Sequence, residues 1–233
     1  MTRSSPTPRR PDRFSLEMIV VVGLTTFHDF LLSDALSLPL ALQRSAQAQL
    51  RSLDRVASGA EIVVPAVVLA VMLILWLARR DGWVHRLAVA YLGWVTLRLV
   101  TKVALVLYIV TSRPQAKVGV LLRDTVVLWF VIFLLFGVWY WIIDAGGPHA
   151  RREGAQGRVD FVFPQRAASL PGWTAWQPGL WDYVFLGFAG STQFGLGDTA
   201  VLSWRAKLLL MLQATLSVAV IVFMASIALS VIH

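Results

Sequence analysis

The chain has 233 residues, of which 57% are hydrophobic and only 15% are charged, and it carries a net charge of +8 and no cysteine. Soluble domains are nearer a quarter charged, so this composition argues against a freely soluble enzyme and against a disordered or collagen-like chain. The missing cysteine excludes disulfide scaffolds and thiolate metal sites. Because the basic residues are dispersed among apolar runs, they favour membrane flanks over a nucleic-acid-binding patch. The composition predicts an all-α integral membrane protein.

The chain before residue 118 is predicted to hold a leader and several membrane helices. Residues 1–15 are rich in proline and arginine, so we expect a disordered basic leader. A helix needs roughly 20 apolar residues to cross about 30 Å of hydrocarbon. Runs of that length lie at 60–78 and 87–110. We therefore expect residues 16–117 to form the N-terminal membrane helices of a multi-pass protein of the cell membrane.

The segment 16–38 decides both the number of spans and the orientation of the chain. It begins as an apolar run, but His28, Asp29 and Asp34 interrupt it, so it either crosses the membrane or lies on its surface. With five spans, basic residues concentrate on the cytoplasmic side, as the positive-inside rule prefers, and the loop 144–178 faces the cytoplasm. With four spans, the basic residues divide almost evenly and that loop can face outward. Both topologies stay open at this point.

Residues 118–233 are predicted to form a second, pore-like module. It starts with a span at 118–143 and ends with a span at 206–232, and between them lies a glycine-, proline- and tryptophan-rich loop at 144–178. The apolar run that opens the segment 179–198 has about a dozen residues, and a helix of that length rises roughly 18 Å, which is half of a bilayer. We therefore expect a re-entrant helix before the last span.

A glycine-rich turn follows this short apolar run. Glycine occupies alternate positions at Gly195 and Gly197, with Leu196 between them. Because glycine tolerates positive φ, this alternation allows successive carbonyl groups to point in the same direction, which L residues resist. Aligned carbonyls can replace the water shell of a cation. The turn is therefore a candidate ion-selectivity filter.

The order of these elements resembles the pore module of potassium channels: a span, a short apolar helix, a Thr-x-x-Gly-x-Gly-Asp turn and a long span. The filter consensus of that family is Thr-Val-Gly-Tyr-Gly-Asp, and the Gly-Leu-Gly-Asp form is similar to filters of two-pore-domain potassium channels. The resemblance begins at Arg123 and implies a pore for a monovalent cation, K⁺ or Na⁺. The filter-like residues that it implies are Thr192, Gln193, Phe194, Gly195, Leu196, Gly197 and Asp198.

Two positions depart from that consensus. Phe194 stands where valine or isoleucine is usual, and Gln193 takes the place of the threonine. The threonine of the family supplies a hydroxyl and a carbonyl to the innermost ion site, and glutamine is too large to copy it. The resemblance therefore implies a pore more strongly than it implies selectivity for potassium.

A second resemblance favours an alternative function. The motifs WYWxxDxGGP, DFxFPQ, WDYxFLGF and WRAKLLLMLQ make the chain similar to a family of uncharacterised actinobacterial multi-pass membrane proteins, in which the filter-like glycines are often replaced. This similarity implies a bacterial inner-membrane protein. It favours a non-conducting scaffold or partner-binding protein with a channel-derived fold.

Backbone chemistry predicts an oligomer. A non-helical turn at membrane depth must be covered by protein or water, because lipid satisfies no N–H or C=O group. One chain has too few spans to surround such a turn, so we expect a homo-oligomer in the lipid bilayer, and a tetramer if each chain supplies one pore loop.

The remaining polar and aromatic residues indicate structural roles and no catalytic, cofactor-binding or metal-binding site. We find no catalytic triad, phosphate-binding loop, cofactor site or metal-ligand set with motif spacing, so the chain is not expected to be an enzyme. Trp139, Tyr140 and Trp141 end the span 118–143 and predict an aromatic belt at the membrane interface.

Overall fold

The structure, a computed structural model, describes residues 19, 22–23, 63–78, 80–112, 118–152, 158–167, 171–173, 176–192 and 195–232. The expected leader at 1–15 lies outside the described residues, and so does most of the segment 16–38. The expectations for those two segments are therefore not addressed by the structure.

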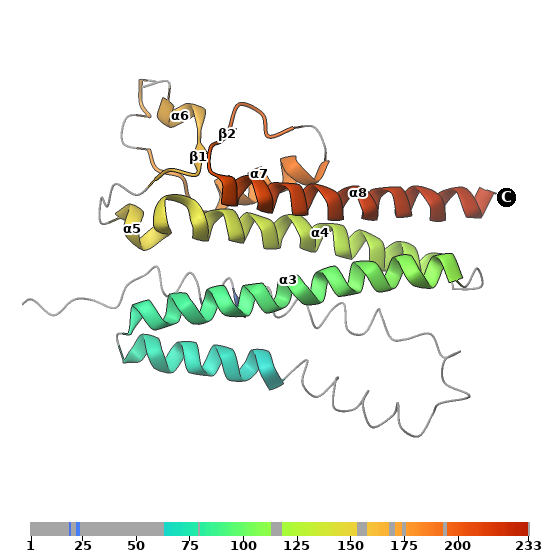
Figure 1. Cartoon of the computed structure of the whole chain (residues 1–233), viewed down its shortest axis with the longest axis horizontal. Helices are drawn as coiled ribbons and strands as arrows, with labels where there is room; N and C mark the ends of the chain where they lie inside the picture. The colour runs from blue at the N-terminus through green and yellow to red at the C-terminus, as the bar shows by residue number, and fades with distance from the viewer. Residues whose placement is uncertain are drawn as a thin grey trace, which may run out of the picture.

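Long apolar helices dominate the described residues (Figure 1). Three of them are long and apolar enough to cross a membrane: α3 (Asp81–Ser112), α4 (Val118–Ile143) and α8 (Trp204–Ile232). A further apolar helix, Val63–Leu77, is shorter, and its described length of about 22 Å falls short of a bilayer. The described part of the chain is thus mostly helical and contains three helices with the dimensions of membrane spans.

The connection between α4 and α8 contains small elements around one further helix. Its elements are η1 (Asp144–Gly146), α5 (Pro148–Arg152), β1 (Phe161–Val162), α6 (Pro164–Ala167), α7 (Leu180–Thr192) and β2 (Ala200–Val201). The two strands pair antiparallel, with Phe161 opposite Val201. The sequence did not predict these strands. Their pairing ties the beginning of the connection to the residues that lead into α8.

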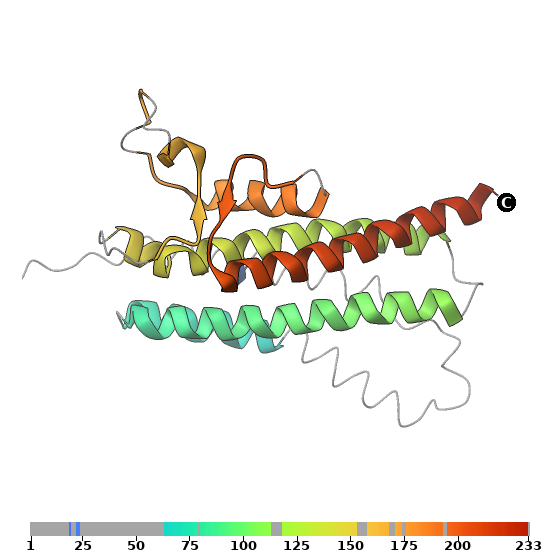
Figure 2. The ribbon, with the colours of Figure 1, turned by 45° about the horizontal axis from the view of Figure 1, so that its top comes forward.

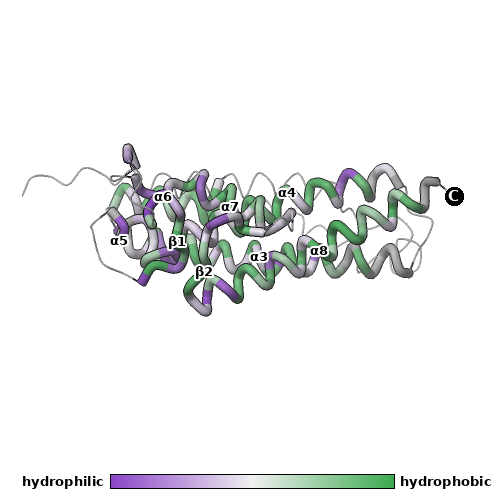
Figure 3. The backbone as a smooth tube through the Cα atoms, turned by 90° about the horizontal axis from the view of Figure 1, so that it is seen from above, coloured by the Kyte–Doolittle hydropathy of each residue, from purple (hydrophilic) through white to green (hydrophobic). Residues whose placement is uncertain are grey.

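The helix α7 lies beside α4 and α8, along the half of the bundle nearest the connecting elements (Figures 1 and 2). The helix α3 packs against α4 and α8 from the other side. Hydrophilic residues gather mainly where α5, α6, β1 and β2 lie, whereas α4 and α8 are mostly hydrophobic along their length (Figure 3). This distribution suits a bundle in lipid with a polar cap at one end.

The core runs along α4. Its buried residues include Leu128, Ile132, Leu135 and Phe136, and from Val131 to Ile142 α4 is buried on nearly all sides because α3, α7 and α8 pack around it. Buried residues of α3 and α8 complete the same cluster. Because lipid tails are as apolar as these side chains, close packing and hydrogen bonds, rather than exclusion of water, hold such helices together.

Candidate functional site: a short helix and its glycine turn

The helix α7 crosses α4 at unusually close range. An ideal Cβ on Gly187 would lie 2.4 Å from the carbonyl oxygen of Phe133 and 3.0 Å from the backbone nitrogen of Gly137. A Cβ on Gly137 would lie 2.8 Å from the Cα of Val184. Distances this short leave no room for any side chain, so the two glycines allow the backbones of α4 and α7 to touch.

Hydrogen bonds define the direction of α7. Near its beginning, the Tyr183 hydroxyl donates to Asp144 at the end of α4, at 2.6 Å. Near its end, the carbonyl of Ser191 accepts from the indole nitrogen of Trp129, an earlier residue of α4, at 3.4 Å. The helix α7 is therefore antiparallel to α4. With 13 residues it rises about 20 Å, roughly half the length of its neighbours.

The glycine turn follows directly. Gly195 has a φ of +84° and Gly197 a φ of +60°, and an ideal Cβ on either would meet nothing within 4 Å. The turn is closed by the backbone N–H of Thr199, which donates to the carbonyl of Leu196 at 3.4 Å. Glycine is required at these two positions by backbone conformation and not by crowding, since a left-handed φ strains every L residue.

The other filter-like residues occupy varied environments. Thr192 ends α7 and its hydroxyl donates to the carbonyl of Ala189 at 3.0 Å. Leu196 is half-buried and packs against the core, whereas Asp198 is exposed. Gln193 and Phe194 lie outside the described residues. The described part of the turn thus presents backbone and one carboxylate at the surface of a single chain.

A buried amide holds the second half of α7. Gln213 of α8 is fully buried, and its side-chain oxygen accepts a hydrogen bond from the hydroxyl of Tyr140. Its nitrogen donates to the carbonyl of Gly187 and to the hydroxyl of Ser191, the latter at 2.6 Å. One carboxamide therefore joins α4, α7 and α8. We call Tyr140, Gly187, Ser191 and Gln213 the amide anchor.

A charged cluster holds the first half of α7. The carboxylate of Asp144 accepts from the Tyr183 hydroxyl and from the backbone N–H groups of Asp160 and Phe161, at 2.7 and 3.2 Å respectively. Asp144 begins the tight turn in which Ala145 has a φ of +50°, so its carboxylate meets the connecting segment as soon as α4 ends. We call Asp144, Asp160, Tyr183 and Arg205 the charged anchor.

Asp160 connects this cluster to the start of α8. Arg205 donates two hydrogen bonds to its carboxylate, at 2.8 and 2.6 Å, and one to the carbonyl of Ile143 at 2.9 Å. Burial alone would raise the pKa of Asp160, but the hydrogen bonds from Arg205 and Ser203 and the nearby guanidinium charge outweigh it, so the pKa lies below its usual value. Asp160 therefore stays ionised at neutral pH.

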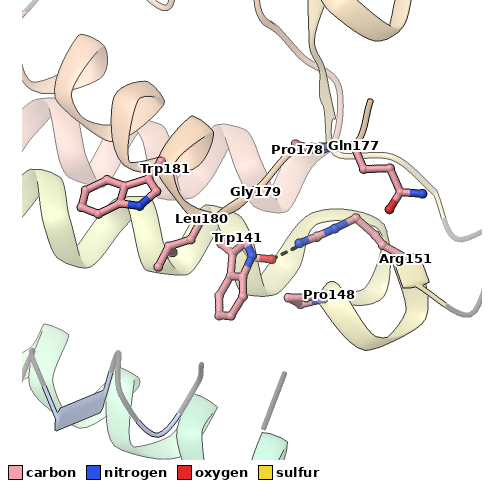
Figure 4. Close-up of a pocket in the computed structure, with 8 residues that line it drawn as sticks. All are labelled: Trp141, Pro148, Arg151, Gln177, Pro178, Gly179, Leu180 and Trp181. Atoms are coloured by element: carbon pink, nitrogen blue, oxygen red, sulfur yellow. Dashed lines mark hydrogen bonds between the residues drawn. The ribbon is translucent and has the colours of Figure 1, made fainter. Parts of the chain in front are cut away.

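A pocket of about 370 Å³ opens beside the first turn of α7 (Figure 4). Arg151, on its wall, reaches back to α4 and donates to the carbonyls of Trp141 and Asp144, at 3.0 and 2.6 Å. The bond to Trp141 satisfies a carbonyl in the last turn of α4, and the Asp144 carbonyl also accepts the backbone N–H of Gly147 at 2.8 Å. The pocket is lined by Trp141, Pro148, Arg151, Gln177, Pro178, Gly179, Leu180 and Trp181.

Sequence reasoning missed the amide anchor and misplaced one of its members. Tyr140 was expected in an interfacial aromatic belt, but it is 0% exposed and faces Gln213 between the helices, so that prediction is wrong for Tyr140. Trp141 is also buried, at 2% exposure. The available signal was Gln213 itself, because a carboxamide inside a long apolar run must find hydrogen-bond partners in the membrane.

No family model, curated protein or solved structure matches this chain. The functional assignment therefore depends on the site itself.

Proposed function

We propose that this protein is an oligomeric membrane pore for monovalent cations, with residues 192–198 lining its narrowest part. The observation that carries the proposal is α7: a half-length helix that packs against two long apolar helices and is followed by a turn with positive φ at Gly195 and Gly197. A helix of this length would reach mid-membrane from one side, which supports a re-entrant role for α7. This arrangement has the order of elements found in potassium-channel pores.

Electrostatics supports a cation as the permeant ion. The carbonyl end of a helix carries a partial negative charge, and the end of α7 leads into the turn. Asp198 adds an exposed carboxylate on the other side of Gly197. Both features attract cations and repel anions, so K⁺ or Na⁺ suits this turn better than chloride.

The exposed turn supports assembly. Gly195 and Gly197 are exposed in the single chain, and lipid does not satisfy their backbone groups. Copies of the chain arranged around an axis would enclose these groups together with water, and one pore loop per chain suggests four copies. Exposed small residues on α8 allow close contact between such copies: Ala225, Ser226 and Ala228.

The full topology of the proposed pore has four or five spans. Residues 63–78 and the segment 16–38 would add to the three long helices. Because the chain has no cysteine, Arg158→Cys gives a single thiol in the connection between α4 and α8. Labelling by an impermeant thiol reagent only after the membrane is made permeable indicates a cytoplasmic connection and five spans. Labelling of intact cells indicates the channel-like orientation.

Cation flux tests the proposal directly. Purified protein in liposomes should carry K⁺ or Na⁺, and Gly195→Ala should abolish the flux because alanine is strained at a φ of +84°. Gly172→Ala is the matched control: Gly172 also has a φ of +84° and open space around its Cβ position, but it lies in the loop before α7. Flux that survives Gly195→Ala places the pore elsewhere.

The second candidate function is a non-conducting scaffold or partner-binding protein. It is favoured by the large exposed indoles near the polar end of the bundle, Trp181 at 78% and Trp204 at 71%. A folded, sealed oligomer that carries no cation flux would select this function over the pore.

A further inference from the structure

We propose that Gln213 is the positioning residue of the glycine turn and that it acts through Ser191. The inference rests on the proposed pore function, because it names the side chain that sets the geometry of the filter-like residues. Gln213 belongs to α8, whereas the turn follows α7, so the two are joined by hydrogen bonds rather than by adjacency in sequence. The inference predicts that a substitution of Gln213 in α8 alters the conformation of the glycine turn.

Hydrogen bonds fix the orientation of the Gln213 amide. Both its oxygen and its nitrogen are engaged, with Tyr140 on one side and with Gly187 and Ser191 on the other. Gly187 and Ser191 are four residues apart and therefore lie on one face of α7. A single amide thus bonds to α7 at two points one turn apart, which fixes the rotation of the helix as well as its distance from α8.

Gly190 of α7 lies beside the amide of Gln213. An ideal Cβ at this position would lie 3.2 Å from the Cδ1 of Leu210 and 3.4 Å from the side-chain oxygen of Gln213. A Cβ would therefore be in van der Waals contact with the amide and would crowd only the end of the Leu210 side chain. The small residue at Gly190 lets α7 and α8 approach closely where Gln213 meets α7.

Ser191 passes the constraint to the turn. Its hydroxyl is held by Gln213 of α8 and its carbonyl by Trp129 of α4. Gly195 follows four residues later, so the turn lies within a chain length of at most about 14 Å of the residue that Gln213 and Trp129 hold. The far side of the turn is held separately, because Leu202 donates its N–H to the carbonyl of Asp160 at 2.9 Å. Hydrogen bonds thus hold a residue on each side of the turn, Ser191 before it and Leu202 after it.

A reporter thiol tests this proposal without relying on conduction. In the cysteine-free chain, Thr199→Cys places one thiol at the half-buried residue that closes the turn. In the purified, assembled protein, Gln213→Leu should raise the rate at which a maleimide labels this thiol by about tenfold, the change expected for one or two lost hydrogen bonds. Thr101→Val on α3, which removes an exposed hydroxyl bonded to Leu97, is the matched control and should leave the rate unchanged.

The isosteric variant Gln213→Glu separates positioning from simple loss of fold. A protonated glutamic acid accepts from Tyr140 and donates to the carbonyl of Gly187, whereas the ionised form can only accept and faces that oxygen unfavourably. The labelling rate of Gln213→Glu, divided by that of Gln213 at the same pH, should be near one at low pH and rise as the pH increases. Ser191→Ala, which keeps the Tyr140 and Gly187 bonds, should raise the rate by a smaller factor and serves if Gln213→Leu does not assemble.

Flux measurements distinguish the two proposals. If wild-type liposomes conduct, Gln213→Leu should change the K⁺/Na⁺ permeability ratio along with the labelling rate. If they do not conduct, the pore proposal fails, and the labelling rates still show whether Gln213 positions the turn. Unchanged labelling in Gln213→Leu, or a Gln213→Glu ratio that is independent of pH, overturns the positioning role whether or not the protein conducts.

Discussion

The two anchors of α7 differ in chemistry although they hold the same helix between the same neighbours. The charged anchor, at the beginning of α7, joins Asp144, Asp160, Tyr183 and Arg205, and Arg205 is 57% exposed. The amide anchor, towards the end of α7, joins Tyr140, Gly187, Ser191 and Gln213, and it contains no ionisable carboxylate or basic group. Each anchor links α7 to both α4 and α8.

The difference follows from depth in the bundle. An ionised side chain is costly within hydrocarbon, by about 2.5–3.5 kcal/mol on insertion scales, but it is well tolerated where water reaches the protein. The charged anchor lies where α4 ends and where α7 and α8 begin, next to the hydrophilic connecting elements (Figure 3), whereas Gln213 lies further along α8 within an apolar run. Neutral groups that satisfy one another are therefore the form that an anchor can take among apolar helices.

The largest expected effect comes from breaking the close backbone contact between α4 and α7. Gly187→Ala would bring a methyl group to 2.4 Å from the carbonyl oxygen of Phe133, so α7 must move away from α4. We expect a loss of about 3 kcal/mol in the free energy of unfolding, measured by denaturation in mixed micelles. Gly93→Ala in α3, where a Cβ meets nothing within 4 Å, should be neutral or slightly stabilising. Equal effects of the two variants would contradict close packing at Gly187.

A pair of tyrosine substitutions compares the anchors directly. Tyr183→Phe removes a hydrogen bond to a carboxylate, and should cost about 2 kcal/mol of unfolding free energy. Tyr140→Phe removes a hydrogen bond to a neutral amide within the bundle, for which about 0.6 kcal/mol is typical in membrane proteins. The same atom is deleted in both variants, so their difference measures the two acceptors. A larger loss for Tyr140→Phe would reverse this ranking of the anchors.

The sequence predicted the long elements well because their signal is local. An apolar run of sufficient length is enough to predict a helix, and the expected span at 118–143 coincides with α4, while 206–232 lies within α8. The dozen apolar residues before the turn became α7. The glycine turn was likewise visible, because alternate glycines point to special backbone conformations.

The anchors were not predictable because their members meet only after folding. Tyr140 and Gln213 are 73 residues apart, and Asp144 and Tyr183 are 39 apart. Nothing in the periodicity of α4 indicates that Tyr140 turns inward while Phe130 is exposed. The paired strands β1 and β2 were missed for the same reason, since two residues in each strand carry no pattern of their own.

The smallest expected effect concerns pH and distinguishes the charged anchor from the amide anchor, which has no carboxylate. Asp160 has a lowered pKa in the folded protein, so it stabilises the fold above its unfolded pKa of about 4, and this contribution is lost as the pH falls through the folded pKa. We expect wild-type unfolding free energy to fall by about 0.5 kcal/mol on this account between pH 5 and pH 3, a modest value because Arg205 is partly exposed.

Arg205→Gln should remove or reverse this dependence. Without the guanidinium, burial of Asp160 acts with less opposition and raises its pKa, so the folded protein takes up a proton more readily than the unfolded chain. The contribution of Asp160 to stability should then be constant or increase as the pH falls from 5 to 3. Gln213→Leu, at the other anchor, should keep the wild-type slope. Parallel slopes for wild type and Arg205→Gln would show that Asp160 does not depend on Arg205 for its ionisation.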